Sequence, residues 1–307
     1  MGNDWSEAMK TLAETMQQYA TKFGLDDLEG IKETAIDGVW FYRSSKGNNR
    51  QPFVYQSGVI VLGQGYKNIH IGQTPVRYGP DDYLVVGVPM PLECEAIAVD
   101  NEPLLGISID ISPAMLQKLV KKLESQRFSN VCEDSTRCGL KSVRMNEQML
   151  DACKRLMTAL CDDLEVAMLG DMLLEEIVYR TLVSESGHVL FDLAYQEGSY
   201  ARVAKALNRV HQEYHEQLNV QTLAEEANMS ISAFHQAFRA VTLESPLQYI
   251  KKVRLNKARE LIQLEGKRVN DAARLVGYSS PSQFSREYKR HFNETPRMTK
   301  LPTESAG

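Results

Sequence analysis

The sequence predicts an α+β fold in which an N-terminal β-barrel with flanking helices precedes a C-terminal all-α domain. Three observations lead to this prediction. Short β-rich runs occupy residues 38–111, amphipathic helical patterns occupy residues 5–30 and 146–185, and only short helices follow residue 200. A chain of 307 residues commonly forms two domains. We therefore predict an N-terminal domain over residues 1–185, a linker over 186–199 and a C-terminal domain over 200–307.

The predicted strands are short, and turn-forming residues separate them. We expect strands at residues 39–42, 53–62, 68–71, 83–88, 94–99 and 104–109. Runs rich in Gly, Pro, Asn and Asp lie between them, such as Gly-Pro-Asp-Asp at 79–82. Several short strands at close spacing indicate a small antiparallel barrel or sandwich.

Helices flank the predicted strands on both sides. Apolar residues recur at three- and four-residue steps within residues 5–30. Ser112 and Pro113 begin another helix, because serine caps a helix start and proline fits the first turn. Helices rich in Leu and Met follow at 149–160 and 164–183. Their apolar stripe indicates either packing within the monomer or a dimer interface.

Charge is unevenly distributed along the chain. The net charge is −5, but residues from Tyr200 onward contain 17 Lys+Arg and 11 Asp+Glu. The basic C-terminal third is compatible with phosphate contact. No apolar run is long enough to predict a membrane span, and the first residues show no apolar signal-peptide core. Five cysteines without a Cys-x-x-Cys pair indicate reduced thiols in a cytoplasmic protein.

Residues 220–241 have the pattern of a helix-turn-helix, in which two short helices pack through small and apolar residues. Asn228 and Met229 form the predicted turn, and Ser230 is the predicted cap of the second helix. Phe234 and Phe238 are expected to face inward. The outward-facing residues are then Ser232, His235, Gln236 and Arg239.

Residues 269–292 repeat this pattern. Gly277 stands in the predicted turn, where glycine permits a positive φ, and Ser280 is the predicted cap. Phe284 and Tyr288 are expected to face inward. The polar residues left on the outside are Ser282, Gln283, Ser285, Arg286, Lys289 and Arg290.

The two units form an internal repeat joined by one long helix. From the recognition helices onward their residues match at an offset of 50, and both units end in Ser-Pro or Thr-Pro. The connector over 247–264 has about 18 residues, or roughly 27 Å of helix. That length suits two recognition helices placed about one duplex turn apart, near ~34 Å. Lys251 and Arg254 lie on this connector.

The C-terminal motifs resemble the DNA-binding domain of bacterial AraC/XylS-type transcriptional regulators over about residues 200–298. The matching motifs are L-A-x-x-A-x-M-S-x-S-x-F-x-x-x-F-R from Leu223, S-P-L-Q-Y-I from Ser245 and V-G-Y-S-S-x-S-Q-F-S-R-E-Y-K-R from Val276. A looser resemblance over roughly residues 20–185 relates the N-terminal part to the cupin-like β-barrel of this family. It depends on G-Q-G-Y-K at 63–67, Y-L-V-V at 83–86 and P-M-P at 89–91.

The resemblance implies base-facing positions for Ser232, His235, Gln236, Pro281, Ser282, Ser285 and Arg286. Gln236 has the donor and acceptor to pair with adenine, and Arg286 has the paired donors that suit guanine. Gln283 is a further exposed polar candidate. We interpret the remaining basic residues as phosphate contacts, which position a protein without specifying sequence. They are Arg239, Lys251, Arg254, Lys289 and Arg290.

The residues indicate no catalytic, cofactor or metal site. His211 and His215 have the i,i+4 spacing of metal ligands, but Gln212 stands where a zincin has glutamate. Only His70 lies among the predicted strands, so we expect a barrel without metal. The sequence between Gly63 and Gly65 is too short for a dinucleotide-binding loop. We therefore predict that the chain is not an enzyme and needs no cofactor.

Together these observations predict a sequence-specific DNA-binding transcription regulator, modulated through its N-terminal domain by a small-molecule effector or a partner. Double-stranded promoter DNA is the expected partner, while RNA polymerase and a second copy of the chain are compatible with the sequence. Two alternatives stay open. One is a cupin-type enzyme with a DNA-binding appendage, and the other is a regulator whose N-terminal domain only binds proteins. The sequence distinguishes neither activator from repressor nor any effector or target site.

Overall fold

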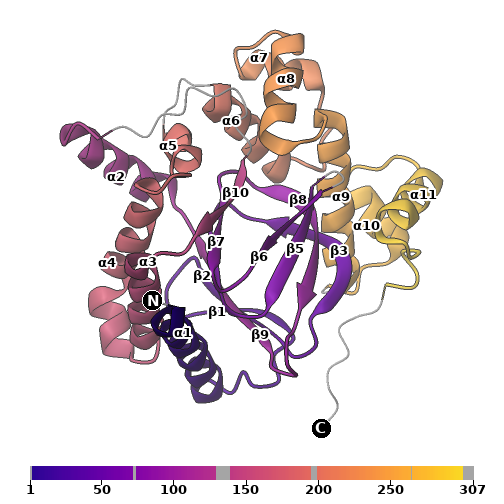
Figure 1. Cartoon of the computed structure of the whole chain (residues 1–307). Helices are drawn as coiled ribbons and strands as arrows, with labels where there is room; N and C mark the ends of the chain where they lie inside the picture. Colours follow the sequence, from indigo (N-terminus) through magenta and orange to yellow (C-terminus); the bar gives the residue numbers. More distant parts are fainter. Residues whose placement is uncertain (1, 72–73, 129–138, 195–198, 264, 300–307) are drawn as a thin grey trace. The chain divides into compact units, whose positions relative to one another are not determined.

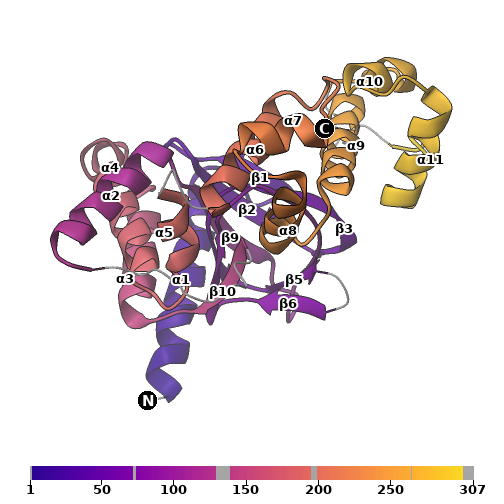
Figure 2. The same ribbon diagram turned by 90° about the horizontal axis from the view of Figure 1, so that it is seen from above.

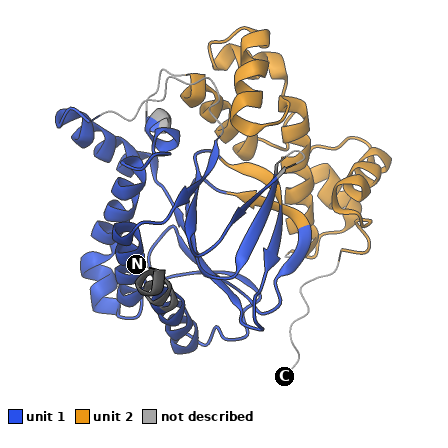
Figure 3. Cartoon of the chain, viewed as in Figure 1, with its two compact units in different colours: residues 1–50, 56–88, 94–198 blue, residues 51–55, 89–93, 199–307 orange. Residues whose placement is uncertain are grey.

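The computed structural model describes residues 2–71, 74–128, 139–194, 199–263 and 265–299 (Figure 1). The pattern of residue contacts divides the chain into two compact units (Figure 3). Unit 1 contains residues 1–50, 56–88 and 94–198, and unit 2 contains residues 51–55, 89–93 and 199–307. Unit 1 combines helices with sheet, whereas helices make up most of unit 2, so the predicted α+β class is confirmed.

The described strands form two separate sheets. One sheet has the order β1-β2-β9-β4-β7-β10 and consists of β1 (Gly30–Glu33), β2 (Val39–Ser44), β4 (Gly58–Gln64), β7 (Asp82–Val86), β9 (Leu104–Asp110) and β10 (Leu140–Arg144). The other has the order β3-β8-β5-β6 and consists of β3 (Asn48–Tyr55), β5 (Tyr66–Ile71), β6 (Thr74–Tyr78) and β8 (Met90–Ile97). The predicted barrel is therefore open, because the outer strands of the two sheets form no ladder with each other among the described residues.

Helices cover one face of the six-stranded sheet in unit 1. These helices are α1 (Gly2–Lys22), α2 (Pro113–Ser125), α3 (Glu147–Ala159), α4 (Asp163–Leu182) and α5 (His188–Ala194). Val59 and Val61 of β4 and Ile107 and Ile109 of β9 point to the same side, because side chains alternate along a strand. All four are buried in one core with residues of α1, α3 and α4. The sheet and these helices therefore share a single hydrophobic core.

Two helix boundaries bear directly on the predictions. The Ser112 hydroxyl accepts a hydrogen bond from the Met115 amide and Pro113 opens α2, so the predicted cap is confirmed. Helix α5 forms within the segment expected to be a linker. Its residues Val189, Leu190 and Phe191 are buried in the core of unit 1. The core thus extends into the predicted linker.

Unit 2 is built around a long central helix. Its helices are α6 (Ser199–Gln212), α7 (Val220–Glu226), α8 (Ile231–Thr242), α9 (Pro246–Gln263), α10 (Val269–Leu275) and α11 (Pro281–Phe292). Helix α9 lies between the α7–α8 pair and the α10–α11 pair in two perpendicular views (Figures 1 and 2). The order and extent of these helices agree closely with the sequence prediction. Residues 300–307 of the predicted C-terminal domain lie outside the described residues.

Candidate nucleic-acid interface

The first helix pair, α7 and α8, has the geometry of a helix-turn-helix. Leu223 and Ala224 of α7 and Phe234 and Phe238 of α8 are almost completely buried, which explains why the two helices stay together. The Ser230 hydroxyl accepts a hydrogen bond from the Ala233 amide at 3.3 Å and satisfies a free donor at the start of α8. These inward positions and the serine cap confirm the prediction.

The second helix pair, α10 and α11, repeats this geometry. The Ser280 hydroxyl accepts from the Gln283 amide at 3.3 Å, and Phe284 and Tyr288 are buried. Gly277 has φ +85° in the turn, and a Cβ at this position would lie 2.5 Å from the carbonyl oxygen of His215. Both the backbone conformation and the close approach therefore require glycine here.

The two turns differ in length by one residue. Asn228 (φ 50°) is the left-handed residue of the first turn. Gly277 is its counterpart in the second turn, 49 positions later in the sequence. The caps Ser230 and Ser280 are offset by 50, so the second turn contains one additional residue. The recognition helices nevertheless match to their ends, because Leu243 and Asn293 are both αL C-caps at an offset of 50.

Helix α9 joins the two pairs through its buried face. Tyr249 packs against Phe238 of α8 with ring centroids 5.4 Å apart. Towards its other end, Leu255, Ala258 and Ile262 share a core with α10 and α11. Helix α9 has 18 residues, and at 1.5 Å per residue it is about 27 Å long. One rigid helix thus sets the separation of the two recognition helices.

The outer faces of the recognition helices are open to solvent. On α8 the exposed candidates are Ser232, His235, Gln236 and Arg239. On α11 they are Pro281, Ser282, Gln283, Arg286, Lys289 and Arg290, while Ser285 is half-buried. Within the described part of the chain, the side chains of Arg239, Arg286 and Lys289 form no hydrogen bond or ion pair. Two polar, solvated helix faces, with Arg239 on α8 and Arg286, Lys289 and Arg290 on α11, suit the major groove of DNA.

Family comparison identifies both parts of the chain. A model described as the AraC-type transcriptional regulator N-terminus matches residues 35–189, and a helix-turn-helix domain model matches residues 223–300. The chain belongs to the AraC-type family of transcriptional regulators.

Curated transcriptional regulators match about a third of the chain. The HTH-type transcriptional regulator AlkR of Acinetobacter baylyi is 32% identical over 98 residues, which are 32% of this chain and 32% of AlkR. The HTH-type transcriptional activator RhaS of Escherichia coli O139:H28 is 30% identical over 101 residues, which are 33% of this chain and 36% of RhaS. The chain spans about a third of the length of these relatives.

Solved structures share the fold over most of the chain. ToxT from Vibrio cholerae superposes with a TM-score of 0.60 and 11% identity, covering 84% of this chain and 95% of ToxT. A second ToxT structure, bound to (E)-4-(8-methylnaphthalen-1-yl)but-3-enoic acid, gives a TM-score of 0.58 at 11% identity and covers 83% and 95% of the two chains. These likenesses show a common fold of sheet and helical regions.

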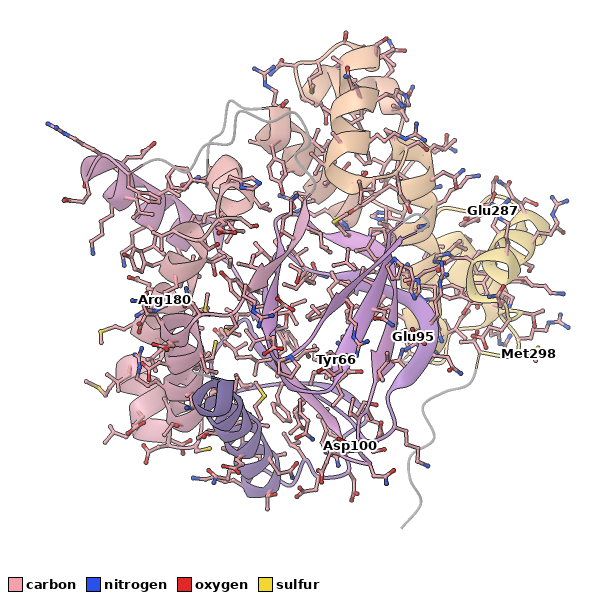
Figure 4. The ribbon with its side chains drawn as sticks, viewed as in Figure 1. Tyr66, Glu95, Asp100, Arg180, Glu287 and Met298 are labelled. Atoms are coloured by element: carbon pink, nitrogen blue, oxygen red, sulfur yellow. The ribbon has the colours of Figure 1, made fainter. Side chains whose placement is uncertain are left out.

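Three candidate residues of the AraC-type DNA-binding region make contacts inside the protein. The Lys251 ammonium lies 3.0 Å from a carboxylate oxygen of Glu287, which also accepts hydrogen bonds from Tyr278 (2.8 Å) and Gln283 (3.2 Å) (Figure 4). Burial raises the pKa of Glu287, but the bonds from Tyr278 and Lys251 outweigh it and hold this pKa below the ordinary value. Lys251 and Gln283 therefore connect α9 to α11.

Arg254 is the third of these residues. Its guanidinium donates to the carbonyl oxygens of Tyr214 at 2.7 Å and Glu216 at 2.6 Å. The side chain is half-buried, and this burial lowers the pKa of Arg254. Arg254 thus fixes the segment that follows α6, next to the glycine of the second turn.

Sequence reasoning missed a cleft beside the second recognition helix. The cleft has a volume of about 720 Å³ and is lined by Arg268, Val269, Asn270, Asp271, Ser285, Thr295, Pro296 and Arg297. Of these residues, only Ser285 was a candidate. The basic pair Lys267-Arg268, directly before a predicted helix, was the available signal.

The remaining predictions concern metals, thiols and membranes. No group of three or more His, Cys, Asp or Glu side chains that could hold a metal occurs among the described residues. Among the described residues, Cys94, Cys153 and Cys161 form no disulfide bond, while Cys132 and Cys138 lie outside the described residues. In the described ranges, no helix combines the length and hydropathy needed to cross a membrane.

Proposed function

We propose that this protein is a transcription regulator that binds promoter DNA by placing α8 and α11 in two successive major-groove segments on one face of the duplex. The single observation that carries the proposal is the pair of matching helix-turn-helix units held by one 18-residue helix. In this proposal residues 200–307 bind DNA, residues 1–185 regulate, and the junction lies within 186–199.

The exposed side chains divide into two groups by chemistry. Ser232, His235 and Gln236 on α8 and Pro281, Ser282, Ser285 and Arg286 on α11 are the proposed base-facing residues. Arg239, Lys289 and Arg290 are the proposed phosphate contacts. Lys251, Arg254 and Gln283 contribute through the contacts that support α11 and the second turn rather than through DNA.

Selection from a random duplex library tests this proposal. The full-length protein is incubated with the library at physiological salt, and the bound fragments are sequenced. We expect two short preferred blocks about one helical turn, near 10 base pairs, apart. A single block, or enrichment that is independent of sequence, would contradict the arrangement of two reading helices.

A small acid is the effector class that unit 1 favours. The buried Lys67 of β5 places its ammonium 3.7 Å from the ring centroid of Tyr42 on β2. Because β5 and β2 belong to different sheets, the Lys67 side chain points between them. Burial lowers the pKa of Lys67, so a nearby carboxylate would stabilise its charged form. The carboxylic acid bound by ToxT is of this class.

Thermal unfolding of the full-length protein tests the effector proposal. Medium-chain carboxylic acids are compared with the primary alcohols of equal length, and both series are repeated with the variant Lys67→Met. An acid at a hundred times its Kd stabilises the native state by about 2.7 kcal/mol. We expect this stabilisation only with acids and only with Lys67. Equal effects of acids and alcohols would refute the role of the lysine, and no effect of either would favour an N-terminal domain that binds only proteins.

A second copy of the chain is the proposed partner of α4. Leu164, Met168 and Met172 follow each other at four-residue steps and are 72%, 68% and 62% exposed. The first turn of α4 is acidic at Asp163 and its last turn is basic at Arg180 (Figure 4). Two antiparallel copies of α4 would therefore match opposite charges and opposite helix dipoles, in a two-fold interface.

The proposed function is regulatory and not catalytic. AlkR and RhaS, which match about a third of this chain, are both named as HTH-type transcriptional regulators. A regulator must reach chromosomal DNA, so we place this protein in the cytoplasm. Where it activates transcription, RNA polymerase is a further proposed partner.

A further inference from the structure

The cleft beside α11 is lined by three segments of unit 2. The start of α10 contributes Arg268 and Asn270, α11 contributes Ser285, and the segment after α11 contributes Thr295 and Arg297. Its volume of about 720 Å³ leaves room for a polar group larger than a water molecule. The cleft thus brings together hydroxyl, amide and guanidinium donors from residues up to 29 positions apart.

The charge of the cleft is positive. Arg268 and Arg297 are exposed, and neither guanidinium forms an ion pair or hydrogen bond with any of the described residues. The one carboxylate in the lining belongs to Asp271, and Arg274 lies 3.2 Å from it. Because Asp271 is paired with Arg274, which is not among the lining residues, the side chains of Arg268 and Arg297 remain available for an anion.

The position of Ser285 connects the cleft to the reading face of α11. Ser285 follows Ser282 by three residues and precedes Lys289 by four, so these three side chains lie on one face of the helix. When that face enters a major groove, the adjoining cleft lies at the groove edge, where the phosphates run. Helix-turn-helix proteins commonly hold the duplex at such places by phosphate contacts.

We propose that this cleft binds a backbone phosphodiester group of the DNA, with Arg268 and Arg297 as its charged ligands. Arginine suits this role because its planar donors match two phosphate oxygens at once. The contact would fix the register of α11 in the groove, and so would act on affinity without adding sequence information. This inference rests on the proposed DNA-binding function.

Salt-dependent binding tests the inference with the duplex obtained by the library selection. The full-length protein is compared with Arg268→Gln, Arg297→Gln and the double variant, and Lys267→Gln is the matched control. Lys267 precedes Arg268 in sequence but does not line the cleft. Each lost phosphate contact lowers the slope of log K against log salt by about 0.9, which is ~3.5-fold in affinity between 50 and 200 mM salt. Because both arginines hold one phosphate, we expect a slope lowered by about 0.9 for the double variant, a smaller change for each single variant and little change for the control.

Neutral methylphosphonate linkages then identify the phosphate. Replacing the bound phosphate should lower the affinity of the native protein for the duplex to that of the double variant. The same replacement should not lower the affinity of the double variant any further. Equal losses for both proteins at every linkage, or an equal slope change for Lys267→Gln, would overturn the proposal.

The two proposals fail in different ways. If the proposed function were wrong, the native protein itself would not discriminate the selected duplex from a scrambled duplex. If only the cleft proposal were wrong, that discrimination would persist while the arginine variants kept the native salt slope.

Discussion

We expect two half-buried histidines to make unit 2 sensitive to acid. The His211 ring lies 2.7 Å from the Tyr249 hydroxyl, and burial, assisted by Lys257, lowers the pKa of His211 to about 4. Burial likewise lowers the pKa of His291 to about 4, with a further contribution from the nearby cation of Lys252. The Nε2 atom of His291 is buried without a hydrogen-bond partner in the described residues. Both rings are therefore neutral in the folded protein at neutral pH.

The sign and size of the effect follow from proton linkage. The ordinary histidine pKa is 6.5, so the unfolded chain binds these protons in a pH range where the folded chain does not. The two neutral histidines therefore contribute fully to the free energy of unfolding above pH 6.5, and this contribution is lost as the pH falls towards 4. Between pH 7 and pH 5 each histidine reduces the free energy of unfolding by about 1.8 kcal/mol, or ~20-fold in the folding equilibrium.

Hydrogen exchange of peptides from α9 and α11 measures this loss in unit 2 itself. Protection of the full-length protein is compared with that of His291→Gln and His211→Gln at pH 7, 6 and 5. Variant and native protein are compared at equal pH, so the intrinsic exchange rate cancels. Between pH 7 and pH 5 the protection factors of the native protein should fall by ~20-fold more than those of either variant. His235→Gln is the control, because His235 is exposed on α8. Parallel pH profiles for all four proteins would refute this account of the half-buried rings.

Three further predictions test other parts of the structure. Arg286→Ala should cost about 1–3 kcal/mol on the selected site and relax one base position, whereas Lys289→Ala should weaken all duplexes and lower the salt slope by about 0.9. Equal losses of Arg286→Ala on matched and mismatched duplexes would contradict base contact. Gly277→Ala should destabilise unit 2 by at least about 1–2 kcal/mol in urea unfolding, because its φ is +85° and His215 blocks the new Cβ. Met168→Glu should shift sedimentation from dimer to monomer, and an unchanged sedimentation coefficient would exclude α4 as the interface.

The helical region could be predicted closely because its local signals agree with one another. Ser230 and Ser280 mark the starts of the recognition helices, and Gly277 marks a turn. The buried rings of Phe234 and Phe284 repeat at the same offset as the caps. Local propensity, capping and apolar spacing thus favour the same boundaries, which is the condition for reliable inference from one sequence.

The strands that the sequence did not reveal are all at sheet edges. Strands β1 and β10 are the two edges of the larger sheet, and β6 is an edge of the smaller one. An edge strand has a neighbour on one side only and needs fewer apolar residues. In β1 three of four residues are exposed, and β6 contains Pro75, which an edge strand tolerates. The single strand expected at 53–62 is the end of β3 and most of β4, which are separated by the polar residues Gln56 and Ser57.

The basic residues of α9 show where a single sequence is insufficient. Solvation and ion pairing give the same pattern of basic residues along a helix, and only the tertiary structure distinguishes them. Lys251 reaches Glu287 of α11, and Arg254 reaches the carbonyl of Tyr214. The first contact holds α11 on α9, and the second holds the segment after α6 on α9. In the role that we propose for Lys251 and Arg254, removal of either charge should weaken a two-block site and leave the salt slope nearly unchanged, whereas a slope lowered by about 0.9 would support a phosphate contact.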